Sequence, residues 1–279
     1  MQEPWPIVAL MRVLTLYPGD RQELNLAGLY LDDLPTEGGH PFIYANFLAS
    51  LDGRIALRNS DGRKGVPEAI ANDRDWRLYS ELLVQADAVL TTGHHAKALA
   101  AGEQTDMMTI AHERYPDLRD IRRSRGLSEH PACIVVTSRL DFPAAALKEA
   151  HPGAILAISP PMDAAKTRAA HKAGVETVMV GSGSQVAGRD VLRVLNERGL
   201  RRVYMVGGPR LFHGLLADGI VHRLYLTTAC RLLGGEEDVE TPVRGPAFPL
   251  PPEARLRGLA LDLDGQPQQI FASYDLSPY

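Results

Sequence analysis

The residues best suited to chemistry follow a short apolar run near the middle of the C-terminal half. Val203–Val206 carry no charge and predict a strand buried on both faces, and Gly207, Gly208 and Pro209 come directly after it. These three residues let the chain turn sharply into a helix predicted at 211–216. The backbone amides and the positive dipole end of such a helix suit a phosphate or another anionic ligand. A tight turn that binds nothing fits the same residues, so both interpretations stay open here.

A second polar group stands at the end of a strand predicted at 42–48. Asn46, Ser50 and Asp52 lie at and just beyond the strand's end, which is where α/β sheets hold their ligands. They are therefore candidate substrate-binding residues. Asp52 also begins an Asp-Gly turn, and a role in satisfying the amides of that turn is the favoured interpretation for its carboxylate.

Residues 181–186 resemble a dinucleotide-binding fingerprint, because Gly181, Gly183 and Val186 have its spacing ahead of a helix predicted at 191–198. The fingerprint of a Rossmann dehydrogenase also needs an acidic residue at the end of the following strand, where it binds the ribose. That strand ends in Val206 and Gly207. A Rossmann dehydrogenase is therefore the least favoured interpretation, although the amides of 181–184 still suit a nucleotide.

Metal binding is not expected. His94 and His95 are adjacent, so their side chains diverge, and neither has a histidine four residues away. Cys133 and Cys230 both lie in apolar, strand-like runs, so they form neither a disulfide framework nor a CxxC metal site.

Composition narrows the class of ligand. The chain has 279 residues, 45% of them hydrophobic, and a formal net charge of -4, which is typical of a globular protein with a large core. This charge gives no basic surface for nucleic acid or an anionic membrane. No apolar run reaches the length of a membrane span, and residues 1–14 lack the pattern of a signal peptide. A small ligand and a cytoplasmic location are expected.

The elements that position these residues alternate along the chain. Strands are predicted at 42–48, 88–91, 132–137, 154–159, 176–180, 203–206 and 224–227, and helices at 73–86, 164–173, 191–198 and 211–216. Such alternation indicates an α/β fold with a mostly parallel central sheet and helices on both faces. Two further runs flank Asp264-Gly265 and predict a closing antiparallel hairpin. The polar stretch 97–125 is expected to be irregular.

Domain organisation is expected to be simple. Residues 1–40 have no clear periodicity and are interpreted as an N-terminal extension that covers an apolar surface or a subunit contact. Residues 41–279 contain no repeat, linker or low-complexity tract, so they are expected to form one domain.

Four blocks carry a resemblance to a known family. They are PFIYANFLASLDGRIA (41–56), DAVLTTG (87–93), IVVTSRLDFP (134–143) and VYMVGGPRLFHGLLADGIVHRLYLTTACRLLGG (203–235). In this order they resemble the C-terminal reductase domain of the riboflavin-biosynthesis protein RibD, over about residues 41–276. The resemblance implies a dihydrofolate-reductase-like fold and a homodimeric, NADPH-dependent reductase, like 5-amino-6-(5-phosphoribosylamino)uracil reductase, that converts a ribosyl group to a ribityl group.

The resemblance also implies a cofactor site at the strand ends. Its positions are Ala49, Thr92, Gly93, Ser138, Arg139, Val180, Gly181, Gly207, Gly208 and Pro209. Each of them lies at the exit of a predicted strand, in agreement with the analysis of the residues themselves. Arg139 suits the adenosine 2′-phosphate, because a guanidinium group binds phosphate with two hydrogen bonds. An exposed surface arginine is an equal alternative.

The chain departs from the family pattern at several positions. Val206 stands where the family usually has a glutamate, His222 where it has an aspartate, and Leu83 where it has an arginine. The block after Gly93 also lacks the acidic pair and proline that are usual there. Because several of these positions concern the substrate, the prediction of a nicotinamide cofactor is firmer than that of the riboflavin-pathway substrate.

Hydride transfer from NADPH to an electrophilic C=N or C=O carbon is the expected reaction, with the protein acting by orientation and exclusion of water. A proton donor is also needed, and the candidates are Asp52, a water molecule, His94 and His95. Two alternatives stay open: a reductase of the same fold with a pterin-like substrate, and a relative that binds a nucleotide without catalysis.

Overall fold

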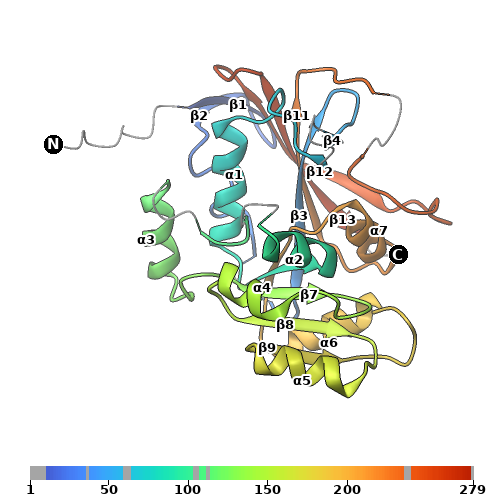
Figure 1. Cartoon of the computed structure of the whole chain (residues 1–279). Helices are drawn as coiled ribbons and strands as arrows, with labels where there is room; N and C mark the ends of the chain where they lie inside the picture. The colour runs from blue at the N-terminus through green and yellow to red at the C-terminus, as the bar shows by residue number, and fades with distance from the viewer. Residues whose placement is uncertain are drawn as a thin grey trace.

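A computed structural model describes residues 11–35, 38–58, 64–102, 107–110, 114–235 and 240–277. Residues 1–10 of the predicted N-terminal extension lie outside them. The fold is built on an 11-stranded sheet with the strand order β2-β1-β12-β13-β11-β3-β10-β6-β7-β8-β9 (Figure 1). Its strands are β1 (Arg12–Tyr17), β2 (Gln22–Asn25), β3 (Phe42–Ser50), β6 (Ala88–Thr92), β7 (Ala132–Val136), β8 (Ile155–Ser159), β9 (Val175–Met179), β10 (Arg202–Met205), β11 (Arg223–Ala229), β12 (Glu253–Asp262) and β13 (Gln269–Ser277). Strands β4 (Leu57–Arg58) and β5 (Lys64–Gly65) form a separate short ladder.

The seven strands from β11 to β9 are all parallel, so their carboxyl ends lie along one edge of the sheet. The helices between them are α1 (Asp73–Val84), α2 (Gly93–Ala100), α3 (Pro116–Ser124), α4 (Ala144–Ala150), α5 (Ala164–Lys172), α6 (Gly188–Glu197) and α7 (Pro209–Ala217). The predicted fold class, α/β with a mostly parallel sheet, helices on both faces and an antiparallel C-terminal hairpin, is confirmed.

Two hydrophobic cores lie on opposite faces of the sheet. Helices α1 to α5 pack on the face that carries Tyr44, Val89 and Tyr204. Helices α6 and α7 pack on the face that carries Ala45 and Met205. Side chains alternate between the two faces along each strand. Successive residues at a strand end therefore face helices α1 to α5 and helices α6 and α7 in turn.

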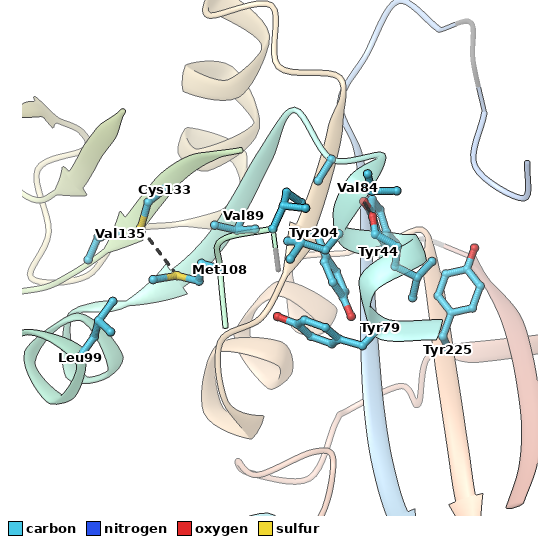
Figure 2. Close-up of a cluster of buried hydrophobic side chains, with 14 of the residues drawn as sticks. Tyr44, Tyr79, Val84, Val89, Leu99, Met108, Cys133, Val135, Tyr204 and Tyr225 are labelled. Atoms are coloured by element: carbon cyan, nitrogen blue, oxygen red, sulfur yellow. Dashed lines mark hydrogen bonds between the residues drawn. The ribbon is translucent and has the colours of Figure 1, made fainter. Parts of the chain in front are cut away.

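A cluster of tyrosines fills the core beneath α1 (Figure 2). The rings of Tyr44 on β3 and Tyr204 on β10 stack with centroids 5.0 Å apart, and Tyr79 of α1 lies 5.4 Å from Tyr204. The Tyr44 hydroxyl donates to the carbonyl of Leu82 at 2.9 Å. These contacts hold α1 against the face of the sheet that β3 and β10 form.

The antiparallel half of the sheet holds the start of α1. Strand β1 pairs with β12, so residues 12–25, which belong to the predicted N-terminal extension, extend the same sheet. Asp262, the last residue of β12, pairs with Arg74 at 2.8 Å, and the Asn72 side-chain amide donates to the carbonyl of Pro267, in the turn after β12, at 3.1 Å. The first turn of α1 is therefore fastened to the C-terminal hairpin.

The prediction of an irregular segment at 97–125 was wrong at 97–100 and 116–124, which are helical, whereas the residues described between these two helices form neither helix nor strand. Helix α2 begins at Gly93, with Thr92 as its N-cap, and covers the sheet through Ala96 and Leu99. Helix α3 is held by Arg122, which is buried and donates to the carbonyls of Val84 and Ala86 at 3.0 and 2.7 Å. A long-range contact of this kind leaves no periodic signal in the sequence.

Candidate active site

The predicted cofactor residues come together along one edge of the sheet. In strand order they lie at the ends of, or just after, β3 (Ala49), β10 (Gly207, Gly208 and Pro209), β6 (Thr92 and Gly93), β7 (Ser138 and Arg139) and β9 (Val180 and Gly181). The strands from β3 to β9 span about 24 Å at the usual spacing of neighbouring strands. This row of strand ends is long enough for an extended dinucleotide.

The turn after β10 leaves the start of α7 open. The Gly207 amide is occupied, because it donates to the carbonyl of Leu90 at 3.2 Å. Gly208 is the N-cap of α7, and no side chain among the described residues caps this helix. A Cβ atom on Gly208 would meet no protein atom within 4 Å. The open amides of the turn therefore begin at Gly208, and there is space in front of them.

The ends of β6 and β7 pack tightly against each other. A Cβ atom on Gly93 would lie 2.8 Å from the Thr137 hydroxyl oxygen, so only glycine fits at the start of α2. The same hydroxyl accepts from the amides of Arg139 and Leu140 at 3.3 and 3.2 Å. The Arg139 side chain is 76% exposed and lies 3.7 Å from Asp141. This exposure fits both interpretations of Arg139, a surface arginine and a side chain that turns toward a 2′-phosphate, so its role stays a prediction.

The loop after β9 differs from the turn after β10. Gly181 has a φ of +64°, which favours glycine, and its neighbours through Gln185 are exposed. The first amide of α6, that of Gly188, donates to Asp218 at 2.5 Å. The N-terminus of α6 therefore already has an anionic partner from the protein, whereas that of α7 has none among the described residues.

The candidate catalytic residue Asp52 braces two loops. It accepts from the Ser50 hydroxyl at 2.5 Å and from the amides of Leu233 and Gly234 at 3.1 and 2.8 Å. These hydrogen bonds, with that from Ser50 the largest cause, lower the pKa of Asp52 below its usual range. The carboxylate thus stays ionised at neutral pH, which suits a structural bond better than proton donation. Its role in catalysis stays a prediction.

Asn46 lies on a different part of the site. It is half-buried on the face of β3 that α1 covers, and the pairing of Met205 with Ala45 places Asn46 level with Val206. Val206 packs against the core on this face. The pairing of Met205 with Leu90 places Thr91 of β6 level with Val206 on its other side. Asn46, Val206 and Thr91 therefore form a row across three strands.

Sequence reasoning missed a buried carboxyl group above this row. Asp75, in the first turn of α1, is 8% exposed, and its side chain hydrogen-bonds to Thr227 of β11. Burial raises the pKa of Asp75 to about 6, and the hydrogen bond to Thr227 opposes this rise. An aspartate in the first turn of a helix is common because of the helix dipole, so nothing in the sequence distinguishes Asp75 from the exposed Asp73.

Two family positions that this chain changes lie away from the strand ends. His222 precedes β11 at the opposite edge of the sheet, where its Nδ1 accepts from the Ile43 amide at 3.0 Å and its ring stacks on Phe42. Burial lowers the pKa of His222. Leu83, on α1, is buried in the core. Of the three substituted positions Leu83, Val206 and His222, Val206 is the one that lies at the strand ends of the candidate site.

The histidines that follow β6 have separate surroundings. His94 is exposed, while His95 is half-buried and donates its amide to Thr92. Within the described residues, no three His, Cys, Asp or Glu side chains gather as metal ligands.

The parallel strand ends, the open start of α7 and the matching sequence define a protein class. The chain belongs to the RibD C-terminal domain family, whose pattern matches residues 41–262, and it is a reductase of this family. A curated relative, the 2,5-diamino-6-ribosylamino-4(3H)-pyrimidinone 5′-phosphate reductase of Archaeoglobus fulgidus, is 26% identical over 198 residues, which are 71% of this chain and 84% of the relative.

Solved structures share the fold. A pyrimidine reductase-like protein from Corynebacterium diphtheriae superposes with a TM-score of 0.65 at 21% identity, over 86% of this chain and 93% of that protein. The riboflavin biosynthesis reductase of Saccharomyces cerevisiae gives a TM-score of 0.54 at 16% identity, over 88% and 94% of the two chains. Every helix among the residues described is too short or too polar to cross a membrane.

Proposed function

We propose that this chain is an NADPH-dependent reductase that transfers a hydride to a phosphoribosylamino-pyrimidine or to a related small heterocycle. The observation that carries the proposal is the row of strand ends, with the open N-terminus of α7 between the ends of β3 and β6. A pyrophosphate fits the amides that follow Gly208, because the glycine leaves space there and the helix dipole favours negative charge. The relative from Archaeoglobus fulgidus supports the substrate class.

The residues divide the work between cofactor and substrate. The Gly208 amide would hold the pyrophosphate, and Pro209, which has no N–H to donate, would lie beside it. Ala49, Thr92, Gly93, Ser138, Val180 and Gly181 would line the rest of the cofactor along the edge. Arg139 would bind the 2′-phosphate. The cofactor would supply a hydride to the electrophilic carbon. Asn46, on the face under α1, would hydrogen-bond the heterocycle, and Ser50 and Asp52 would shape the loop beside it.

Binding is tested first, with a thermal shift and a fluorescence titration of the purified chain with NADPH, and with NADH as the matched control. A rise in melting temperature that is larger with NADPH than with NADH is expected. If neither nucleotide changes the melting temperature or the fluorescence, the cofactor assignment is wrong.

Turnover is tested next, by following the loss of reduced-nicotinamide absorbance with the diamino-ribosylaminopyrimidinone phosphate, its deaminated uracil counterpart and a dihydropterin. Oxidation of NADPH with a ribosylaminopyrimidine supports the proposal, and oxidation with the pterin alone would assign a different substrate. Val206 favours the alternative of a relative that binds a nucleotide without catalysis, because its apolar side chain replaces the acid usual in the family. Tight binding of NADPH with no turnover would support that non-catalytic alternative.

We also propose that the chain forms a homodimer, as the family resemblance implies. Sedimentation velocity should give the mass of two chains, and a single chain at micromolar concentration would contradict this.

A further inference from the structure

Three buried polar atoms on the face beneath α1 have no hydrogen-bond partner within the described part of the chain. They are Oδ1 of Asp75 and the hydroxyl oxygens of Thr91 and Tyr204. Asp75 is 8% exposed and Thr91 is fully buried. A buried polar atom without a hydrogen-bond partner costs free energy of folding. A function at these atoms would account for that cost.

The carboxyl group of Asp75 lies beside the proposed substrate position. Thr227, its hydrogen-bond partner, pairs with Leu48, so the carboxyl group lies over β11 and β3 one residue before Ala49. It is also close enough to Tyr204 of β10 to influence that hydroxyl group. Leu48 and Tyr204 bracket Asn46 and Val206 on this face. The Asp75 carboxyl group of α1 thus lies near Val206, whose apolar side chain supplies no carboxyl group to the site.

The charged neighbours of Asp75 are engaged elsewhere. On α1 itself, Asp73 pairs with Arg114 at 2.5 Å and Arg74 pairs with Asp262 at 2.8 Å. Arg77, one half-turn further, pairs with Glu81 and Asp117.

Within the part of the chain that the structure describes, the groups that interact with Asp75 from other elements are uncharged. They are Tyr30 from the segment after β2, Tyr204 from β10 and Thr227 from β11. With no cation among them to stabilise the carboxylate, burial favours the protonated acid.

We propose that Asp75 is the general acid of the reduction, and this rests on the proposed function. As the hydride forms a C–H bond at the electrophilic carbon, the π electron pair of the C=N bond moves to nitrogen. The nitrogen takes the proton from the Asp75 carboxyl group, whose O–H bond breaks. The nicotinamide leaves oxidised, and the Asp75 carboxylate regains its proton from water. Asp52 suits this step less well, because three hydrogen bonds keep it ionised.

The activity test compares Asp75→Asn with Asp73→Asn, an exposed position in the same helical turn. We expect kcat with the ribosylaminopyrimidine phosphate to fall by about 100-fold or more in Asp75→Asn, with the Kd for NADPH unchanged. Asp73→Asn should stay within about twofold of the original chain. Equal kcat values for the original chain and Asp75→Asn would overturn the assignment.

The variant Thr227→Val tests whether the pKa of Asp75 sets the pH dependence of turnover. Thr227→Val removes the hydrogen bond that stabilises the carboxylate while keeping the shape of the side chain. In the original chain, kcat should fall as the pH rises above about 6, and in Thr227→Val this descending limb should move to higher pH. A limb at the same pH in both proteins would contradict the role.

A measurement without turnover separates this inference from the proposed function. Carbon-13 NMR of aspartate-labelled protein, with the Asp75 signal assigned by its loss in Asp75→Asn, should show titration near pH 6. Titration at the ordinary value for an aspartate would overturn the general acid even in an active reductase. Failure of the original chain to bind NADPH would instead overturn the proposed function, and the assignment of Asp75 with it.

Discussion

Replacing Gly208 tests the phosphate site without disturbing the fold. The backbone of Gly208 has φ -72° and ψ -178°, which other residues adopt, and a Cβ atom there meets no protein atom within 4 Å. Aspartate and asparagine are both better N-caps than glycine, by a few tenths of a kcal/mol. Neither Gly208→Asp nor Gly208→Asn should therefore lower the melting temperature.

The two variants differ only in charge, so their difference measures repulsion of the ligand. A carboxylate about 6 Å from a phosphate, at an effective dielectric constant of about 20, costs about 3 kcal/mol, or about 100-fold in Kd. Gly208→Asn should weaken binding less, by about fivefold, because its side chain only competes for amides worth about 1 kcal/mol.

Isothermal titration calorimetry with NADPH at two salt concentrations gives both Kd values. The difference between the variants should shrink at high salt, because exposed charges are screened. Equal affinities for NADPH in the Asp and Asn variants, at low salt and with normal melting temperatures, would refute the placement of a phosphate at α7.

Three further substitutions probe packing, protonation and cofactor choice. Gly93→Ala should lower the free energy of unfolding by about 1–3 kcal/mol in a denaturant titration, because its Cβ atom would lie 2.8 Å from the Thr137 hydroxyl oxygen. The double variant Gly93→Ala, Thr137→Ala should lose less stability than the sum of the two single variants. Burial raises the pKa of Asp75 from 3.8 to about 6, so its contribution to stability is complete below pH 3.8 and is lost as the pH rises through 6. Asp75→Asn should therefore gain about 3 kcal/mol relative to the original chain between pH 4 and 7 in urea unfolding, and a pH-independent difference would contradict burial of the charge. Arg139→Ala should weaken NADPH about tenfold and leave NADH unchanged in a fluorescence titration, whereas equal losses for both would exclude a contact with the 2′-phosphate.

The parallel sheet could be predicted from the sequence because its strands are buried on both faces. Continuous runs such as 132–137 have no polar alternation, and each is followed by a glycine, proline or polar turn. Parallel strands that end in such turns place their tips at one edge, so the row of candidate cofactor residues followed from the order of elements alone. The structure adds which helix start is open. The Asp218 carboxylate accepts from the first amide of α6, whereas no side chain among the described residues caps the start of α7.

Other features depend on contacts between distant residues. Strand β1 lies in the sheet through pairing with β12, some 250 residues away, which no local pattern encodes. In the sequence, Asp75 is indistinguishable from any other aspartate in the first turn of a helix. It is buried only because α1 packs over β3 and β11. His222 stands in a conspicuous family position, yet it lies at the opposite edge from the candidate site.

The most direct test of the central claim is a crystal structure of this chain with NADPH bound. The account predicts the pyrophosphate at the amides that follow Gly208, and the rest of the cofactor along the carboxyl ends of the strands from β3 to β9. A cofactor bound at the opposite edge of the sheet, or on the antiparallel strands, would contradict it.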